Sequence, residues 1–121
     1  MVIEALEKFI DYKNELVAEE FKKLNQGQRE VVQTYFYRNS FENLTDYLIF
    51  DHVWSTYLQE IIDYLKELNI SKFIFADTST ECFESMKILM NNGFKLSTIE
   101  YRREKMFRMP EKVITGILVE L

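Results

Sequence analysis

The first part of the chain places its apolar residues with a helical period. From residue 2 to residue 24 they recur every three to four positions, as on the buried side of an amphipathic helix. We therefore expect one helix over residues 2–24, ending before Gly27, which can adopt a positive φ. A second helix should begin near Gln28 and pass through Tyr35 and Phe36. The apolar positions of the first helix are Ile3, Leu6, Ile10, Val17, Phe21 and Leu24.

The middle of the chain contains a third helical pattern. Asp51 is a suitable N-cap for it, and Asn69 should end it, with Ile70 folding back on the last turn. The apolar residues 47–50 before it predict either a short strand or a buried loop. The apolar face of this helix consists of Trp54, Leu58, Ile61, Ile62, Leu65 and Leu68.

The pattern becomes extended after residue 70. Residues 71–76 form a short apolar run, which predicts a buried strand. Residues 94–103 alternate between apolar and polar side chains and predict a second strand. Residues 112–120 predict a third strand, in which Gly116 marks a bulge that would change the exposed face.

A further helix is predicted between the first two of these strands. Thr78 and Glu81 have the spacing of a capping box, so Thr78 should cap the helix and Glu81 should reach back to it. Asn92 and Gly93 should end it. Its apolar residues are Phe83, Met86, Leu89 and Met90.

Together these elements predict an α+β fold in a single domain, residues 1–121. Residues 1–38 should be its helical N-terminal part and residues 39–121 its α/β part, in which the order β-α-β-β forms a mixed three-stranded sheet. The first two strands should be joined by a right-handed parallel crossover, and the last two should form an antiparallel hairpin. The expected core packs the third helix on the first strand through Trp54, Leu58, Ile61, Ile62, Leu65, Phe73 and Phe75.

Composition narrows the class of protein. A chain of 121 residues with 47% apolar residues can build one dense core. Only three Gly and one Pro argue against a turn-rich all-β fold and against glycine-dependent nucleotide loops. The charged N-terminus is unlike a signal peptide, and no apolar run approaches the ~20 residues that span a bilayer, so we expect a cytoplasmic protein. Its many aromatic residues favour some exposed apolar surface, which a homodimer would cover.

Charge is distributed unevenly around a net value of -5. Residues 39–65 contain five carboxylates and no Lys or Arg, which predicts an acidic face that binds a basic protein partner. Basic residues cluster near the predicted hairpin, where they could contact a nucleic acid. The carboxylates of the acidic face are Glu42, Asp46, Asp51, Glu60 and Asp63. The basic residues of the hairpin are Arg102, Arg103, Lys105 and Arg108.

The chain has few residues suited to catalysis or metal binding. It has one histidine, His52, and one cysteine, Cys82, so neither a zinc site nor a Ser/His/Asp arrangement is expected. Residues 77–80 follow a buried strand and open a helix, a place where ligands bind in α/β proteins. Capping explains the Ser and Thr residues there, and a ligand site is the alternative. We expect no catalytic residue, metal or cofactor, and a protein that is not an enzyme.

Two resemblances add to this interpretation. Residues 85–95, ending in Gly93-Phe94-Lys95, resemble the helix and "GF" step in the C-terminal part of GNAT acetyltransferases. The acetyl-CoA loop of that family, Arg/Gln-x-x-Gly-x-Gly/Ala, has no counterpart in this chain. The resemblance implies a shared β-α-β shape, with a divergent acyltransferase as one alternative function.

The second resemblance covers the chain from about Leu48 to its C-terminus. It is to small uncharacterised α/β proteins encoded on phages, plasmids and integrative elements of Gram-positive bacteria. Small acidic proteins of such elements often inhibit host defence nucleases, anti-CRISPR proteins among them, so the resemblance implies a Cas or other defence nuclease as partner. The matching segments are 48–51 (LIFD), 65–70 (LKELNI), 92–95 (NGFK), and Pro110 with Val113 and Ile114.

The sequence therefore favours a non-catalytic binding protein, an inhibitor or regulator that presents its acidic face to a basic, nucleic-acid-binding protein. The alternatives are a nucleic-acid-binding protein that uses residues 101–108, and the divergent acyltransferase.

Overall fold

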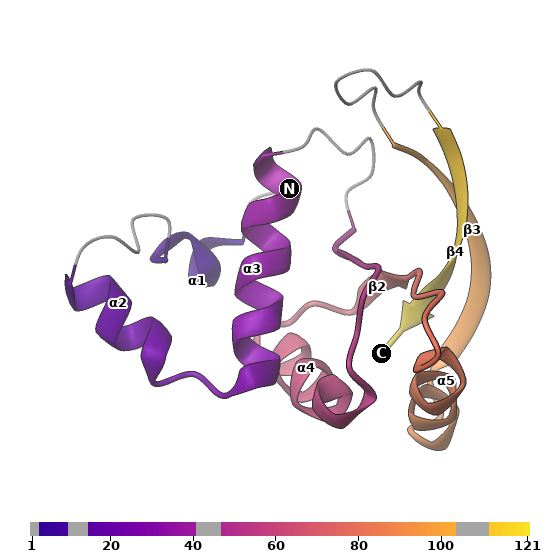
Figure 1. Cartoon of the computed structure of the whole chain (residues 1–121), viewed down its shortest axis with the longest axis horizontal. Coiled ribbons are helices and arrows are strands. Elements are labelled where there is room, and N and C mark those ends of the chain that lie inside the picture. The colour runs from indigo at the N-terminus through magenta and orange to yellow at the C-terminus, as the bar shows by residue number, and fades with distance from the viewer. Residues whose placement is uncertain (1–2, 10–14, 41–46, 104–111) are drawn as a thin grey trace.

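The chain folds into a layer of helices packed on a four-stranded sheet. The structure is a computed structural model, and it describes residues 3–9, 15–40, 47–103 and 112–121. Figure 1 shows the elements along the chain. They are α1 (Glu4–Glu7), α2 (Glu15–Lys22), α3 (Gln26–Ser40), β1 (Ile49–Phe50), α4 (Ser55–Glu67), β2 (Lys72–Phe75), α5 (Cys82–Asn91), β3 (Lys95–Arg103) and β4 (Lys112–Glu120).

The sheet has the strand order β1-β2-β4-β3. β1 is parallel to β2, and β4 is antiparallel to both β2 and β3. The predicted α+β fold and the antiparallel β3–β4 hairpin are therefore confirmed. The predicted three strands become four, because residues 49–50 pair with β2. The two strands joined by α5 are parallel, but β4 lies between them.

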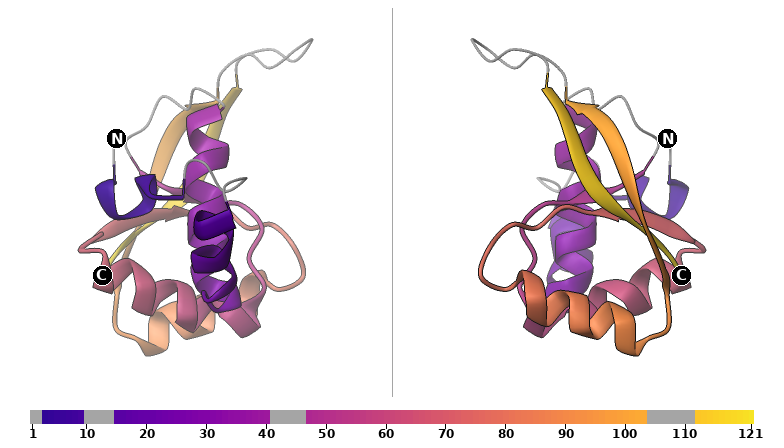
Figure 2. Two further views of the ribbon diagram at one scale, coloured as in Figure 1. Left: turned by 90° about the vertical axis from the view of Figure 1, so that its left-hand side faces the viewer. Right: turned by 90° about the vertical axis from the view of Figure 1, so that its right-hand side faces the viewer.

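Helices cover one face of the sheet and form a single hydrophobic cluster with it. In the right-hand view of Figure 2, α3 lies behind the β3–β4 hairpin, and α4 and α5 run beneath the sheet. Phe73, Phe75 and Val119 contribute to this cluster from the strands. Its buried members on the helices are Leu6, Val31, Val32, Tyr35, Leu58, Ile61, Ile62, Tyr64, Leu65 and Leu89.

Helix α4 ends as predicted. Asn69 has φ 59°, which is the left-handed conformation of a residue that follows a helix. The Ile70 amide donates to the Leu65 carbonyl at 2.8 Å, and the Asn69 amide donates to the Lys66 carbonyl at 3.0 Å. This pair of bonds is the Schellman motif. Gly93 ends α5 in a similar way, with φ 73° and its amide 3.0 Å from the Met90 carbonyl.

The N-terminal helices differ from the prediction of one helix over residues 2–24, which is wrong. α1 ends at Glu7, and α2 ends at Lys22. Asn25 then begins α3 with a reciprocal capping box: its side chain accepts from the Gln28 amide at 2.8 Å, and the Gln28 side chain accepts from the Asn25 amide at 3.0 Å. Gly27 consequently lies inside α3, where its role is a close helix contact rather than a positive φ.

Helix α1 is attached to α3 through Tyr35. The Tyr35 hydroxyl accepts a hydrogen bond from the Ile3 amide at 3.2 Å and donates one to the Glu7 carboxylate. Leu6 and Phe9 are buried beside this contact, in the same hydrophobic cluster. The short helix is therefore held by both apolar burial and a buried hydroxyl.

Gly116 does not mark a bulge, and that prediction is wrong. The β3–β4 register is continuous through the Ile99–Gly116 pair. A Cβ atom at Gly116 would lie 2.8 Å from Cγ2 of Ile74 and 3.3 Å from Cε1 of Tyr101. Glycine is required there because Ile74 and Tyr101, both buried, pass over its backbone.

Candidate partner-binding surface

Two loops meet where the parallel strands β1 and β2 end. Residues 51–54 connect β1 to α4, and residues 76–81 connect β2 to α5. The carboxylate of Asp77, which is buried, accepts from the Val53 amide at 3.3 Å and from the Ser79 amide at 2.7 Å. One side chain therefore holds both loops, at the strand ends where α/β folds commonly bind ligands.

Glu81 forms a second link between these loops. Its carboxylate accepts from the Ser55 amide at 3.1 Å and also from the Ser55 hydroxyl. Because Ser55 is the first residue of α4, Glu81 caps that helix from a neighbouring loop, and its negative charge lies at the positive end of the helix dipole. The helix does not need a cap from Asp51, and that prediction is wrong: its N-cap residue is Trp54, which forms no side-chain cap.

The predicted capping box of α5 is also wrong. Thr78 is exposed, and α5 begins at Cys82 without a side-chain cap. The Ser79 hydroxyl instead accepts from the Glu81 amide at 3.3 Å, which continues the local turn that Asp77 begins. The sequence spacing of Thr78 and Glu81 fits a capping box, but Glu81 is used by α4.

Asp77 should therefore matter for stability and Thr78 should not. Asp77→Ala leaves the Val53 and Ser79 amides without their acceptor, which typically costs about 1–3 kcal/mol for each buried donor that stays unsatisfied. Thr78→Ala is the matched control, because Thr78 is exposed. Urea unfolding of the three proteins measures the difference. Equal loss of stability in both variants would contradict the role of Asp77.

Trp54 is the largest exception to the predicted core. Its side chain is 51% exposed, so its predicted packing against β2 is wrong. Trp54 has extended backbone angles, φ -74° and ψ 120°, and precedes the first helical residue. Trp54 is therefore outside the helix, and the helical period that brings Leu58 and Ile62 into the core does not apply to it. The ring of His52 lies edge to face with it, with centroids 5.3 Å apart.

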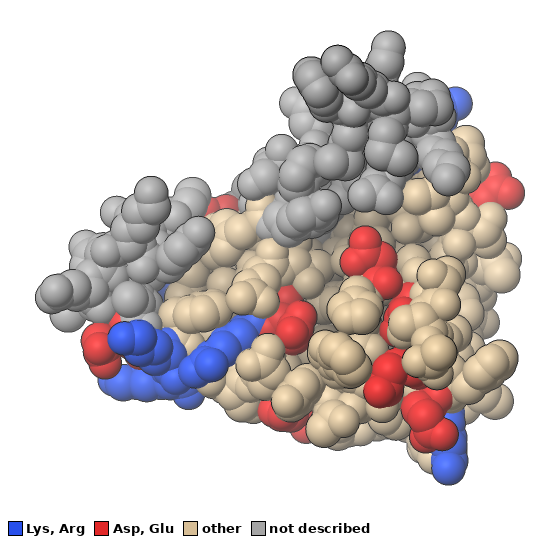
Figure 3. All heavy atoms as spheres, viewed as in Figure 1, with Lys and Arg blue, Asp and Glu red and all other residues tan. Residues whose placement is uncertain are grey.

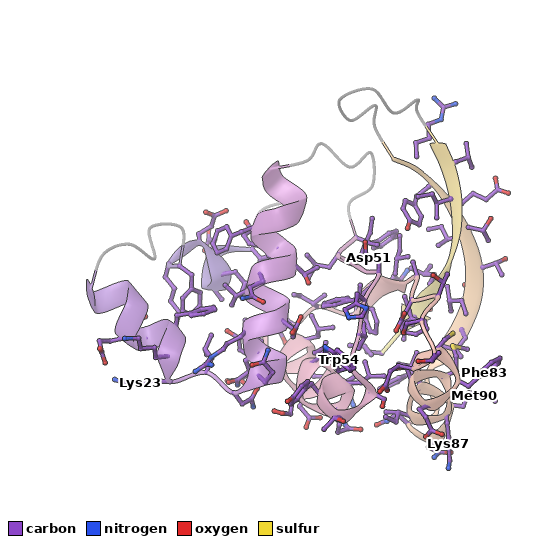
Figure 4. All side chains as sticks on the ribbon, in the orientation of Figure 1. Lys23, Asp51, Trp54, Phe83, Lys87 and Met90 are labelled. Atoms are coloured by element: carbon purple, nitrogen blue, oxygen red, sulfur yellow. The ribbon has the colours of Figure 1, made fainter. Side chains whose placement is uncertain are left out.

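The acidic residues predicted from the sequence are only partly within the described residues. Asp51 and Asp63 are exposed, and Glu60 is half-buried beside α3. Asp63 accepts from the Gln59 side chain at 3.0 Å. Glu42 and Asp46 lie outside the described residues. Figure 3 shows Asp and Glu gathered over the middle of the viewed face, around the position that Figure 4 gives to Trp54, with Lys and Arg towards the edges.

Two of the four basic residues predicted for the hairpin lie within the described residues, both at the end of β3. Arg102 is exposed on the edge strand β3. Arg103 ends that strand, while Lys105 and Arg108 lie outside the described residues. A different basic cluster joins α2 to α3 and was not predicted: the Arg29 guanidinium donates to the Lys22 carbonyl at 2.6 Å, and Lys23 is exposed nearby (Figure 4). The signal in the sequence that could have indicated it is the adjacent Lys22-Lys23 pair.

Within residues 3–9, 15–40, 47–103 and 112–121, no group of three or more His, Cys, Asp or Glu side chains could hold a metal ion. Burial raises the pKa of the Tyr64 phenol above its ordinary value, and the nearby Glu67 charge raises it further. Tyr64 therefore stays protonated at physiological pH and does not supply a base. No helix in the described part of the chain is long and apolar enough to cross a membrane.

Comparison with family models assigns the chain to a family. The model described as Domain of unknown function (DUF7698) matches residues 30–121, which is most of the sequence. The chain belongs to the DUF7698 family. The DUF7698 match begins inside α3, so it contains the sheet, α4, α5 and both loops around Trp54, but not α1 or α2. Comparisons with curated proteins and with solved structures give no match.

Proposed function

We propose that this protein is a non-catalytic binding protein whose acidic surface around Trp54 docks on a basic protein partner. The observation that supports the proposal most is the half-exposed Trp54 ring on a face where carboxylates gather. Trp is enriched among the residues that dominate binding energy, because it buries a large area at a small cost in side-chain entropy. An exposed Trp in an acidic setting favours a partner that offers apolar area bordered by cations.

The loop that carries Trp54 is already fixed before binding. The Val53 amide on one side of it is bound by Asp77, and the Ser55 amide on the other side is bound by Glu81. A partner therefore loses little affinity in ordering this loop. The same two bonds also leave Asp77 and Glu81 committed to structure, which favours binding over acid–base catalysis.

The negative charge should speed association with the partner more than it adds to the binding affinity. The carboxylates of the acidic surface are those of Asp51, which precedes α4, and Asp63, in the second half of that helix, and both are exposed. Exposed ion pairs contribute only about 0–1 kcal/mol each, but their summed field accelerates association with a cationic surface. The resemblance to proteins of mobile elements supports a specific partner class: a cytoplasmic defence nuclease, whose nucleic-acid groove is basic.

Charge reversal and truncation of Trp54 test the proposal. Asp51→Lys alone should weaken binding by less than about fivefold, the double variant Asp51→Lys/Asp63→Lys by more than about tenfold, and Trp54→Ala by more than about tenfold. A labelled oligoarginine peptide reports the charge effects first, and a purified nuclease of the proposed class then tests all three variants. Fluorescence anisotropy at two salt concentrations measures both, and affinity should fall as salt rises.

The matched control changes the same charge elsewhere. Glu4→Lys/Glu20→Lys reverses two exposed carboxylates on α1 and α2, outside the DUF7698 match. It should retain binding, and circular dichroism should show that every variant is folded. Full binding by the folded Asp51/Asp63 double variant would reject the acidic surface. Binding of a labelled single-stranded oligonucleotide that is lost in Arg102→Glu would instead support the nucleic-acid-binding alternative, which the exposure of Arg102 favours.

A further inference from the structure

The outer side of α5 exposes two large apolar side chains. Phe83 is 86% exposed and Met90 is 65% exposed. Seven residues separate them, so they lie on the same side of the helix, about 10 Å apart along its axis. Figure 4 shows both side chains directed away from the body of the protein. The opposite side of α5 faces the interior, where Ser85 and Leu89 are buried, so Phe83 and Met90 lie outside the core.

We propose that two copies of the chain pair through this side of α5, with the helices antiparallel about a twofold axis between Met86 and Lys87. In that arrangement Phe83 meets the partner's Met90, and Met90 meets the partner's Phe83. The twofold axis makes both contacts identical, as an isologous interface requires. A thioether against an aromatic ring is a favourable pairing, and the flexible Met side chain adapts to the ring.

The charges on the same side of α5 support an antiparallel second copy. Glu84 and Lys87 are exposed beside the apolar pair. The two ion pairs within the described residues, Lys22–Glu19 and Lys72–Glu120, do not involve either residue. The antiparallel arrangement places Glu84 within about 3 Å, measured along the helix axis, of the partner's Lys87. A parallel arrangement would instead place each charge opposite its own copy.

The expected dimer is weak. α5 has ten residues, which corresponds to a length of about 15 Å. A standard interface buries about 800 Å² on each partner, and one short helix offers less than this. We therefore expect a dissociation constant in the micromolar range, below about 500 µM, so that monomer and dimer exchange with protein concentration.

Sedimentation equilibrium tests the dimer directly. The average mass of the purified protein should rise from the monomer towards twice that value as its concentration increases to about 500 µM. Phe83→Asp should weaken dimerisation by at least about tenfold, since it buries a charge against Met90. The control Val113→Asp changes an apolar residue on β4 that is 60% exposed, and it should leave the dimer intact. Both variants should keep the circular dichroism spectrum of the folded protein.

Charge exchange separates an antiparallel dimer from other ways of covering the helix. Glu84→Lys and Lys87→Glu should each weaken the dimer about two- to tenfold, because the twofold axis doubles the effect of one exposed pair. The double variant should restore it. A wild-type protein that stays monomeric at 500 µM would overturn the proposed dimer. Single charge variants without effect, or a double variant without rescue, would overturn the antiparallel pairing.

The dimer does not depend on the proposed function. Trp54→Ala should weaken binding of the basic protein partner and leave the monomer–dimer equilibrium unchanged. Phe83→Asp should weaken the dimer and leave binding of the basic protein partner unchanged. Loss of both properties in a folded Trp54→Ala variant would show that α5 and the acidic surface form one interface, which contradicts the dimer as proposed.

Discussion

Replacing Ile62 with Asp should unfold the protein. Ile62 is fully buried on α4, within the hydrophobic cluster that joins the helices to β2 and β4. The substitution removes an apolar side chain and places a carboxylate where water cannot solvate it. Burying an unpaired polar group costs several kcal/mol, and an unpaired charge costs more, against a total stability of roughly 5–15 kcal/mol for a domain. We expect loss of the cooperative thermal transition at neutral pH.

Far-ultraviolet circular dichroism during heating measures this effect. Thr56→Asp is the matched control, because it introduces the same side chain on an exposed position in the first turn of the same helix. An acidic residue is favourable there, so the control should melt like the wild-type protein. An unchanged melting temperature for Ile62→Asp would show that this side of α4 is accessible to water.

Replacing Gly27 with Ala should destabilise the contact between α3 and α4. A Cβ atom at Gly27 would lie 2.3 Å from Cβ of Glu60, and 2.9 Å from both the Ile61 amide nitrogen and the Tyr57 carbonyl oxygen. Two of these atoms belong to the backbone of α4, which cannot turn aside as a side chain can. The helices must move apart, and overpacking of this kind costs about 1–3 kcal/mol.

The opposing effect is helix propensity. Alanine is about 1 kcal/mol more favourable than glycine inside a helix, so Gly27→Ala would stabilise α3 if the contact were open. Gln33→Ala, at an exposed position of α3, gives the reference for a substitution without a close contact. Urea unfolding should show a lower midpoint for Gly27→Ala and little change for Gln33→Ala. A higher midpoint for Gly27→Ala would contradict the close approach of the two helices.

The acidic part of the site could be predicted from sequence, because carboxylate side chains almost always face solvent whatever the fold. A stretch without Lys or Arg predicts an acidic surface, and the structure exposes Asp51 and Asp63 but half-buries Glu60 beside α3. The exposure of Trp54 could not be predicted, since it depends on the residue at which α4 begins. That point is set by Ser55, whose amide is bound by Glu81 from a loop 26 residues away in the sequence. Local spacing alone assigned Glu81 to its own helix.

The sequence by itself determined the elements whose causes are local. Asn69 and Gly93 end their helices because each can adopt a positive φ, and the bonds that follow join residues within one turn. The strand over residues 112–120 was predicted with its observed limits, because nine residues of extended pattern are sufficient to define it. These features rest on the conformational preferences of neighbouring residues.

Only the tertiary structure decided the features that join distant segments. β1 has two residues and exists because it pairs with β2, where the Ile74 amide donates to the Leu48 carbonyl at 2.8 Å. Gly27 is required by the backbone of α4, and Gly116 is required by Ile74 and Tyr101. Each of these contacts forms between residues that are far apart along the chain. The conformational preferences of one segment do not specify which distant segment will pack against it. These close contacts are therefore determined only when the whole chain folds.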